Sequence, residues 1–128
     1  MSITFMPMIH SPATNEWRIP EAVRVDPDRF EFNVANANGF DLLLALGLAP
    51  ESCGELALDA FAGLVTAGLR RHLGHRSPEM ATVTDAAPGR MTMIFCGRRE
   101  GYLEERLGDL ARLAQRGREA GATHISWS

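Results

Sequence analysis

The segment 100–120 constrains the fold most, because it has the pattern of a long amphipathic helix between two β-rich stretches. Its apolar residues recur at three- and four-residue spacing and form one stripe, which consists of Leu103, Leu107, Leu110 and Ala114. Residues 91–96 before it and 123–127 after it have the composition of strands. A helix of this length can join two parallel neighbouring strands by a right-handed crossover. We therefore expect a β-α-β unit at the end of the chain.

Earlier in the chain, alternation of apolar and polar residues predicts strands at 2–9 and 30–34, and a short strand at 23–25. Pro7 cannot donate a hydrogen bond to a neighbouring strand, so we expect the first strand to lie at an edge or to contain a bulge. The loop at 10–20 separates the strand at 2–9 from the short strand at 23–25.

Two further helices are predicted before the β-rich stretch at 91–96. One begins at Asn36 or Asn38 and ends at Gly47, and the other runs from about residue 55 to 73. Residues 81–84 and 91–96 flank the sequence Ala-Ala-Pro-Gly at 86–89, which predicts a hairpin, since proline and glycine suit the two central positions of a tight turn.

These elements predict an α+β (or α/β) fold in a single globular domain, residues 1–128. We expect a single mixed sheet of about four to five strands, with about three helices packed mainly on one face, as a two-layer sandwich. The chain has 128 residues, of which 45% are hydrophobic and 23% charged, so it can bury a core without disulfides or metals.

Charge and hydropathy exclude several classes of function. The net charge of -3 argues against broad nucleic-acid binding, which usually needs an excess of basic residues. All 13 of the basic residues are arginine. No apolar stretch approaches the roughly 20 residues that span a bilayer, and the first residues do not resemble a secretion signal. The two cysteines, Cys53 and Cys96, make neither a disulfide framework nor a zinc site, so we expect reduced thiols in a cytoplasmic protein.

The first candidate site lies between the strand at 30–34 and the helix that follows. It consists of Asn33, Asn36, Asn38 and Asp41. Amides both donate and accept hydrogen bonds, and a helix N-terminus offers free N–H groups, so this junction suits a polar or anionic ligand. The alternative is structural: the asparagines cap the helix and fix the turn, with Asp41 in the first turn.

The second candidate site follows the strand at 91–96 and consists of Arg98, Arg99 and Tyr102. Ligands often collect beyond the carboxyl ends of strands, where paired arginine donors recognise phosphate or carboxylate and a tyrosine ring stacks on a base. The alternative is a solvated loop with the arginines in water. The neighbouring pair Glu104 and Glu105 has the pattern of solvated helix surface.

No complete catalytic or metal-binding pattern is present in the sequence. The four histidines, His10, His72, His75 and His124, lack the spacing of a helical metal pair, and no nucleophile motif occurs. We therefore predict no catalytic residue, no metal ligand and no cofactor.

The expected function is a non-enzymatic binding module that recognises a polar or anionic small molecule, for example a nucleotide, or a protein partner, and that self-associates as a homo-oligomer. One alternative is a small hydrolase or transferase with histidine and aspartate from separate loops, which requires two titratable side chains to converge in one cleft. The other is a purely structural protein that assembles through an exposed apolar face.

Overall fold

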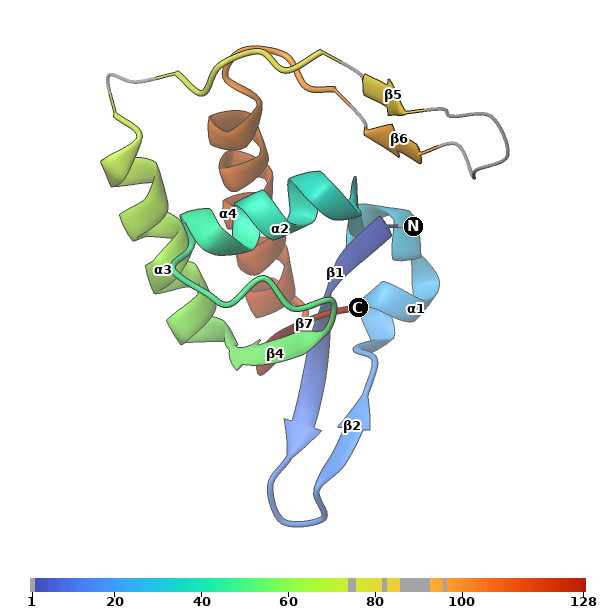
Figure 1. Cartoon of the computed structure of the whole chain (residues 1–128). Coiled ribbons are helices and arrows are strands. Elements are labelled where there is room, and N and C mark those ends of the chain that lie inside the picture. The colour runs from blue at the N-terminus through green and yellow to red at the C-terminus, as the bar shows by residue number, and fades with distance from the viewer. Residues whose placement is uncertain (1, 74–75, 82, 86–92, 96) are drawn as a thin grey trace.

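A computed structural model describes residues 2–73, 76–81, 83–85, 93–95 and 97–128 of the chain (Figure 1). The fold is α+β, as the sequence predicts. In chain order the elements are β1 (Ser2–Ser11), β2 (Glu16–Arg18), α1 (Glu21–Val25), the 3-10 turn η1 (Pro27–Arg29), β3 (Phe32–Ala35), α2 (Asn36–Ala45), β4 (Gly54–Ala57), α3 (Leu58–Arg71), β5 (Val83–Asp85), β6 (Met93–Phe95), α4 (Tyr102–Glu119) and β7 (His124–Trp127).

The strand β1 is the centre of a five-stranded antiparallel sheet with the order β2-β1-β7-β4, in which β3 also pairs with β1. On one side β1 pairs first with β3, from Ser2 to Phe5, and then with β2, from Ile9 to Ser11. On the other side it pairs with β7, which in turn pairs with β4. The sequence therefore predicted the number of strands in this sheet but not their pairing.

Pro7 lies in a central strand, so the predicted edge position is wrong for β1 as a whole. Thr4 and Ser128 exchange both backbone hydrogen bonds, which directs the N–H groups of even-numbered β1 residues towards β7. The nitrogen of Pro7 therefore faces the other side, in the interval between the residues that pair with β3 and those that pair with β2. The missing donor therefore falls on the side of β1 where, among the described residues, no strand pairs with Pro7.

One face of the sheet carries the hydrophobic core, and the three long helices cover that face. The inward side chains of the sheet that are buried are Ile3, Phe5, Pro7, Phe32, Val34, Ile125 and Trp127. They pack in one cluster with helix residues such as Leu42, Phe61 and Leu107. Figure 1 shows α3 and α4 side by side with α2 crossing them. The opposite face of β1, with Met6 and Met8, stays half-buried and has no helix over it in the described part of the chain.

The expected parallel β-α-β unit at the end of the chain is wrong. β6 pairs with β5 in a separate antiparallel pair, and β7 lies between β1 and β4, antiparallel to both. Both edges of β7 are thus occupied, which leaves no place for β6 beside it, and every described strand pair is antiparallel rather than mixed. The predicted pairing of the hairpin arms is confirmed, whereas its turn at 86–89 lies outside the described residues.

Four further segments differ from the prediction in their type or their bounds. Residues 23–25 form the end of α1 rather than a strand; Pro20 precedes the helix and Val23 alone is buried from it. β3 begins at Phe32, because Phe30 ends the 3-10 turn, although its side chain is still buried. β2 lies in the expected loop at 10–20, and β4 occupies residues that we expected in the second helix.

β4 depends on a close contact between its first residue and the last residue of β7. Gly54 lies opposite Trp127, and a Cβ atom at Gly54 would lie 2.5 Å from Cζ2 of the buried indole. Such a separation is far below van der Waals contact, and a rigid ring in a packed core cannot move aside cheaply.

We predict that Gly54→Ala lowers the free energy of unfolding by about 1–3 kcal/mol, the usual cost of overpacking a core. Gly63→Ala is the matched control, because nothing lies within 4 Å of a Cβ placed there on α3. The control should stabilise the protein by about 0.5–1 kcal/mol through helix propensity. Urea unfolding of the two variants and the parent measures both effects; equal midpoints for all three would contradict the close packing.

Candidate functional site

The first candidate segment is split between the two faces of the sheet. Asn33 lies on β3 with its side chain exposed on the helix-free face, where its amide donates to Ser2 Oγ at 2.9 Å and to Thr4 Oγ1 at 2.7 Å. This amide therefore links β3 to β1 and does not fix the turn before the helix.

Asn36 and Asn38 lie in the first turn of α2, but neither caps it. Ala35 is the N-cap residue and no side chain bonds to the free N–H groups there, so the capping prediction is wrong. Asn38 is only 6% exposed. Because the helix begins at Asn36, Asp41 falls in the second turn rather than the first, three residues after Asn38 and on the same side of the helix.

The structure joins the two candidate segments through one ion pair. Arg98 Nη1 donates to Asp41 Oδ2 at 2.6 Å, across 57 positions of the sequence. The side chain of Arg98 is 8% exposed and that of Asp41 is 42% exposed. The backbone of Arg98 is fixed by two 2.7 Å hydrogen bonds with Met80. A buried cation thus has a half-exposed carboxylate as its partner.

The Nε–H of Arg98 is buried and has no hydrogen-bond partner among the described residues. Nine in ten or more of the buried polar groups in proteins are satisfied, and leaving one unpaired costs about 1–3 kcal/mol or more when it is charged. Arg106 has a similar Nε–H, but that guanidinium also lies over the rings of Phe32 and Tyr102, with centroids 5.4 and 5.5 Å from its central carbon.

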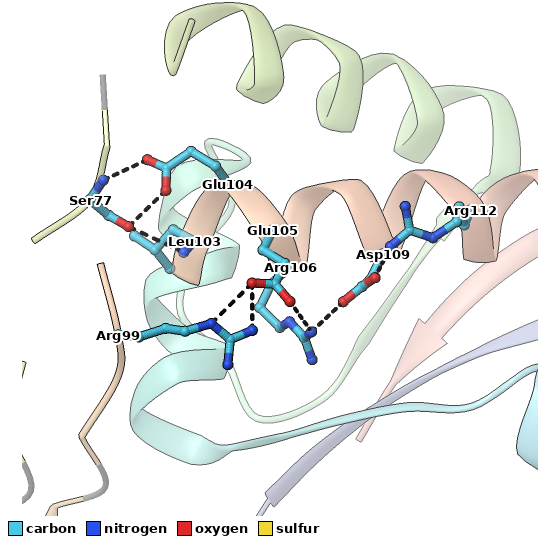
Figure 2. A network of polar contacts seen from close by, with 8 residues as sticks. All are labelled: Ser77, Arg99, Leu103, Glu104, Glu105, Arg106, Asp109 and Arg112. Carbon is cyan, nitrogen blue, oxygen red and sulfur yellow. Dashed lines mark hydrogen bonds and ion pairs between the residues drawn. The ribbon is translucent and has the colours of Figure 1, made fainter. Parts of the chain in front are cut away.

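Arg99 belongs to a different cluster, which runs along α4 (Figure 2), and the ring of Tyr102 contacts Arg106 of that cluster. Arg99 contacts Glu105 Oε2 through Nη2 at 2.5 Å and through Nε at 3.1 Å. This pairing raises the pKa of Arg99 and lowers that of Glu105. The ion pairs continue along the helix through Arg106, Asp109 and Arg112. The charge of Arg99 is therefore paired with that of Glu105. Arg106 covers a face of the Tyr102 ring, which we expected to stack on a ligand.

Sequence reasoning missed a further polar cluster, which consists of Ser77, Glu104 and His72 (Figure 2 shows the first two). Glu104 accepts hydrogen bonds from the backbone N–H of Ser77 and from its hydroxyl, both at 2.8 Å, and contacts His72 Nδ1 at 2.9 Å. Ser77 Oγ in turn accepts the backbone N–H of Leu103 at 3.2 Å. Ser77 is buried and the side chain of Glu104 is 20% exposed, so Glu104 is not the solvated surface residue that its pattern indicated.

This cluster is a helix cap built from a distant segment. Serine bonding to an N–H of the first turn, with a glutamate reaching back to the serine N–H, is the arrangement of a capping box, here made by residues 27 apart. A hydrolytic triad would instead need the serine hydroxyl to donate to the imidazole. A histidine and a carboxylate therefore meet here, but the serine hydroxyl donates to the carboxylate rather than to the imidazole.

The pKa of Glu104 fits the role of a helix-capping carboxylate. Burial by itself would raise the pKa of this carboxyl, but hydrogen bonds from its own backbone, from Ser77 and from His72 outweigh it and lower the pKa to about 2. A carboxyl with such a pKa stays ionised at neutral pH and does not exchange protons there.

The comparisons with known proteins find no relatives. No protein-family model, no curated protein and no solved structure matches this chain.

The described residues also bear on the expectations about metal sites, membrane spans and cysteines. No group of three or more histidine, cysteine, aspartate or glutamate side chains that could hold a metal occurs among them. None of the helices in that part of the chain is long and apolar enough to cross a bilayer. Cys53 is an exposed free thiol, whereas Cys96 and His75 lie outside the described residues. A cleft of about 320 Å³ beside β2 and α1 is lined by none of the predicted site residues.

Because the pKa of Glu104 is lowered on folding, its ionised form stabilises the folded state above pH 4.5 and loses this contribution as the pH falls towards 2. We predict that Glu104→Gln reduces the pH dependence of stability in that window and lowers the free energy of unfolding at pH 7 by about 1–3 kcal/mol. Urea unfolding from pH 2 to 7 measures both.

The control for this experiment is Glu31→Gln, at an exposed glutamate just before β3. It should keep the pH profile of the parent. A Glu104→Gln profile that also follows the parent would mean that Ser77 and Glu104 are not paired in solution.

Proposed function

We propose that the protein is a non-enzymatic binding module for a polar or anionic small molecule, and that its binding site is the Arg98–Asp41 pair beside α2. The observation that carries the proposal is the buried guanidinium of Arg98, which among the described residues has one half-exposed carboxylate as a partner and one unpaired buried donor. An arginine fork matches the two oxygens of a phosphate or carboxylate. The nearby Asn38 adds a buried amide on the same side of α2.

Asp41 occupies the place that a ligand oxygen would take. Its side chain is 42% exposed, so it can turn towards water without loss of packing, whereas Arg98 is held in place by its burial and by the backbone pairing with Met80. A ligand anion would exchange with the Asp41 carboxylate on a fixed guanidinium. Such internal competition makes binding selective for ligands that contact Arg98 better than Asp41 does.

Of the seven residues that the sequence indicates as candidates, Asn38, Asp41 and Arg98 belong to the proposed site. Asn36 lies at the same helix end. Asn33 is on the opposite face of the sheet, and Arg99 and Tyr102 are engaged by Glu105 and Arg106.

Self-association, a protein partner and a cytoplasmic location are further parts of the proposal. The half-buried sheet face without a helix supports an assembly role, and the exposed thiol of Cys53 suits a reducing compartment. Native mass spectrometry of the protein purified from its source reports the number of subunits and any small molecule that remains bound.

The decisive experiment compares three variants by calorimetry with inorganic phosphate and a nucleoside monophosphate as probes. Arg98→Lys should weaken binding by about 10- to 100-fold, because a charged paired hydrogen bond contributes about 1.5–3 kcal/mol. Asp41→Asn should strengthen it, because the competing carboxylate is gone. Arg99→Ala is the matched control and should bind as the parent does.

Thermal melts of each variant with and without the probe separate lost binding from lost folding. Equal weakening by Arg99→Ala and Arg98→Lys, or no effect of either, would contradict the site. Weaker anion binding by Asp41→Asn would contradict the competition between the carboxylate and the ligand.

A further inference from the structure

Three aromatic rings gather on the helix-free face of the sheet, far along β1 from the Arg98 site. They belong to His10 on β1, Trp17 on β2 and His124 on β7. The ring centroids of His10 lie 4.5 Å from Trp17 and 5.5 Å from His124, and those of Trp17 and His124 are 5.0 Å apart. Trp17 is 41% exposed, so the cluster lies at the surface.

A methionine lies beside these rings. Met8 is the cross-strand partner of His124 and precedes His10 by two residues, so all three project from the same face of the sheet. Directly opposite residues of an antiparallel pair have Cβ atoms about 4.5–5.5 Å apart, which brings the thioether of Met8 within reach of both imidazoles.

Each imidazole has one nitrogen held by a neighbouring oxygen. His10 Nε2 lies 2.9 Å from Asn15 Oδ1, which can only accept, so this nitrogen carries the hydrogen and Nδ1 keeps a lone pair. His124 Nδ1 lies 2.8 Å from Thr123 Oγ1, a hydroxyl oxygen that can accept a hydrogen bond from this nitrogen. When Nδ1 carries the hydrogen and donates to Oγ1, Nε2 of His124 keeps the lone pair that a metal ion needs.

We propose that Met8, His10 and His124 form a site for a soft monovalent metal ion, Cu(I) or its analogue Ag(I), with the indole of Trp17 beside it. In metal sites the second ring nitrogen of a histidine is almost always bonded to a neighbouring group that fixes its orientation. Asn15 and Thr123 hold His10 and His124 in that way. Two imidazoles on one ion have centroids about 5–6 Å apart, given metal–nitrogen bonds of about 2 Å, and the 5.5 Å separation falls in this range.

The donor chemistry selects the metal. A thioether and two neutral imidazoles are soft and intermediate ligands that carry no charge, which favours a monovalent soft ion over Zn²⁺. No cluster of three histidine, cysteine or carboxylate side chains that would suit a divalent ion occurs in the described part of the chain. The electron-rich face of Trp17 also attracts a cation.

The test uses Ag(I), which needs no reductant, and the full chain with Cys53→Ser and Cys96→Ser, since free thiols would also bind the ion. Calorimetry should give one ion per chain, and the fluorescence of Trp17 should change on binding. His10→Gln, His124→Gln and Met8→Leu should each weaken binding by at least about 10-fold, since each removes a direct ligand. Asn15→Gly keeps the positive φ of that residue and should weaken binding by about 10- to 100-fold.

Met80→Leu is the matched control, because Met80 is 49% exposed and pairs with Arg98 away from this cluster. It should bind Ag(I) as the background does. The site is refuted by an absence of Ag(I) binding, by unchanged affinity in Met8→Leu, or by equal weakening in Met80→Leu. Zn²⁺ binding as tight as that of Ag(I) would refute the preference for a soft monovalent ion. Thermal melts of each variant confirm that it is folded.

Discussion

The whole fold depends on the ten residues of β1, because this strand pairs with three others. Its pairing with β7 joins the two ends of the chain, and Thr4 and Ser128 exchange backbone hydrogen bonds across 124 positions. Contacts of this sequence separation form late and at a high entropic cost. The same strand serves two faces: Ile3, Phe5 and Pro7 enter the core, while Met8 projects from the other side beside the histidine cluster.

The cap of α4 connects this core to the proposed binding site. Ser77 bonds to Leu103 through its hydroxyl and to the N–H of Gly101 through its carbonyl, which anchors the segment 76–80 to the start of the helix. Met80, at the end of that segment, then pairs with Arg98. The position of the buried guanidinium beside α2 therefore follows from a serine that caps a helix, and the site inherits the rigidity of that cap.

Helices and strands with a clear hydrophobic periodicity could be predicted from the sequence. The strands and side chains with which they pair could not. The stripe of leucines located α4 within two residues at its start, and alternation located β7, since both patterns are local. Residues 55–57 of β4 were expected at the start of the second helix, whereas their strand state comes from pairing with β7. Asp41 and Arg98 were both identified as candidates, but no pattern indicates that they meet. Glu104 was assigned to the surface because its partner Ser77 lies 27 residues away.

All basic residues of this chain are arginine, but the choice of arginine over lysine has a structural consequence at only one of the three positions Arg76, Arg98 and Arg99. Near the start of α4, Arg76 pairs with Glu100, and Arg99 pairs with Glu105, at exposed positions where a lysine would serve as well. Arg98 is different, because a buried lysine readily loses its proton, whereas a guanidinium keeps its charge and its fork of donors. Its carboxylate partner Asp41 is half-exposed, which is the reason that we propose an anion can take its place. The proposed site therefore depends on the least exposed of these three arginines, where lysine could not replace arginine.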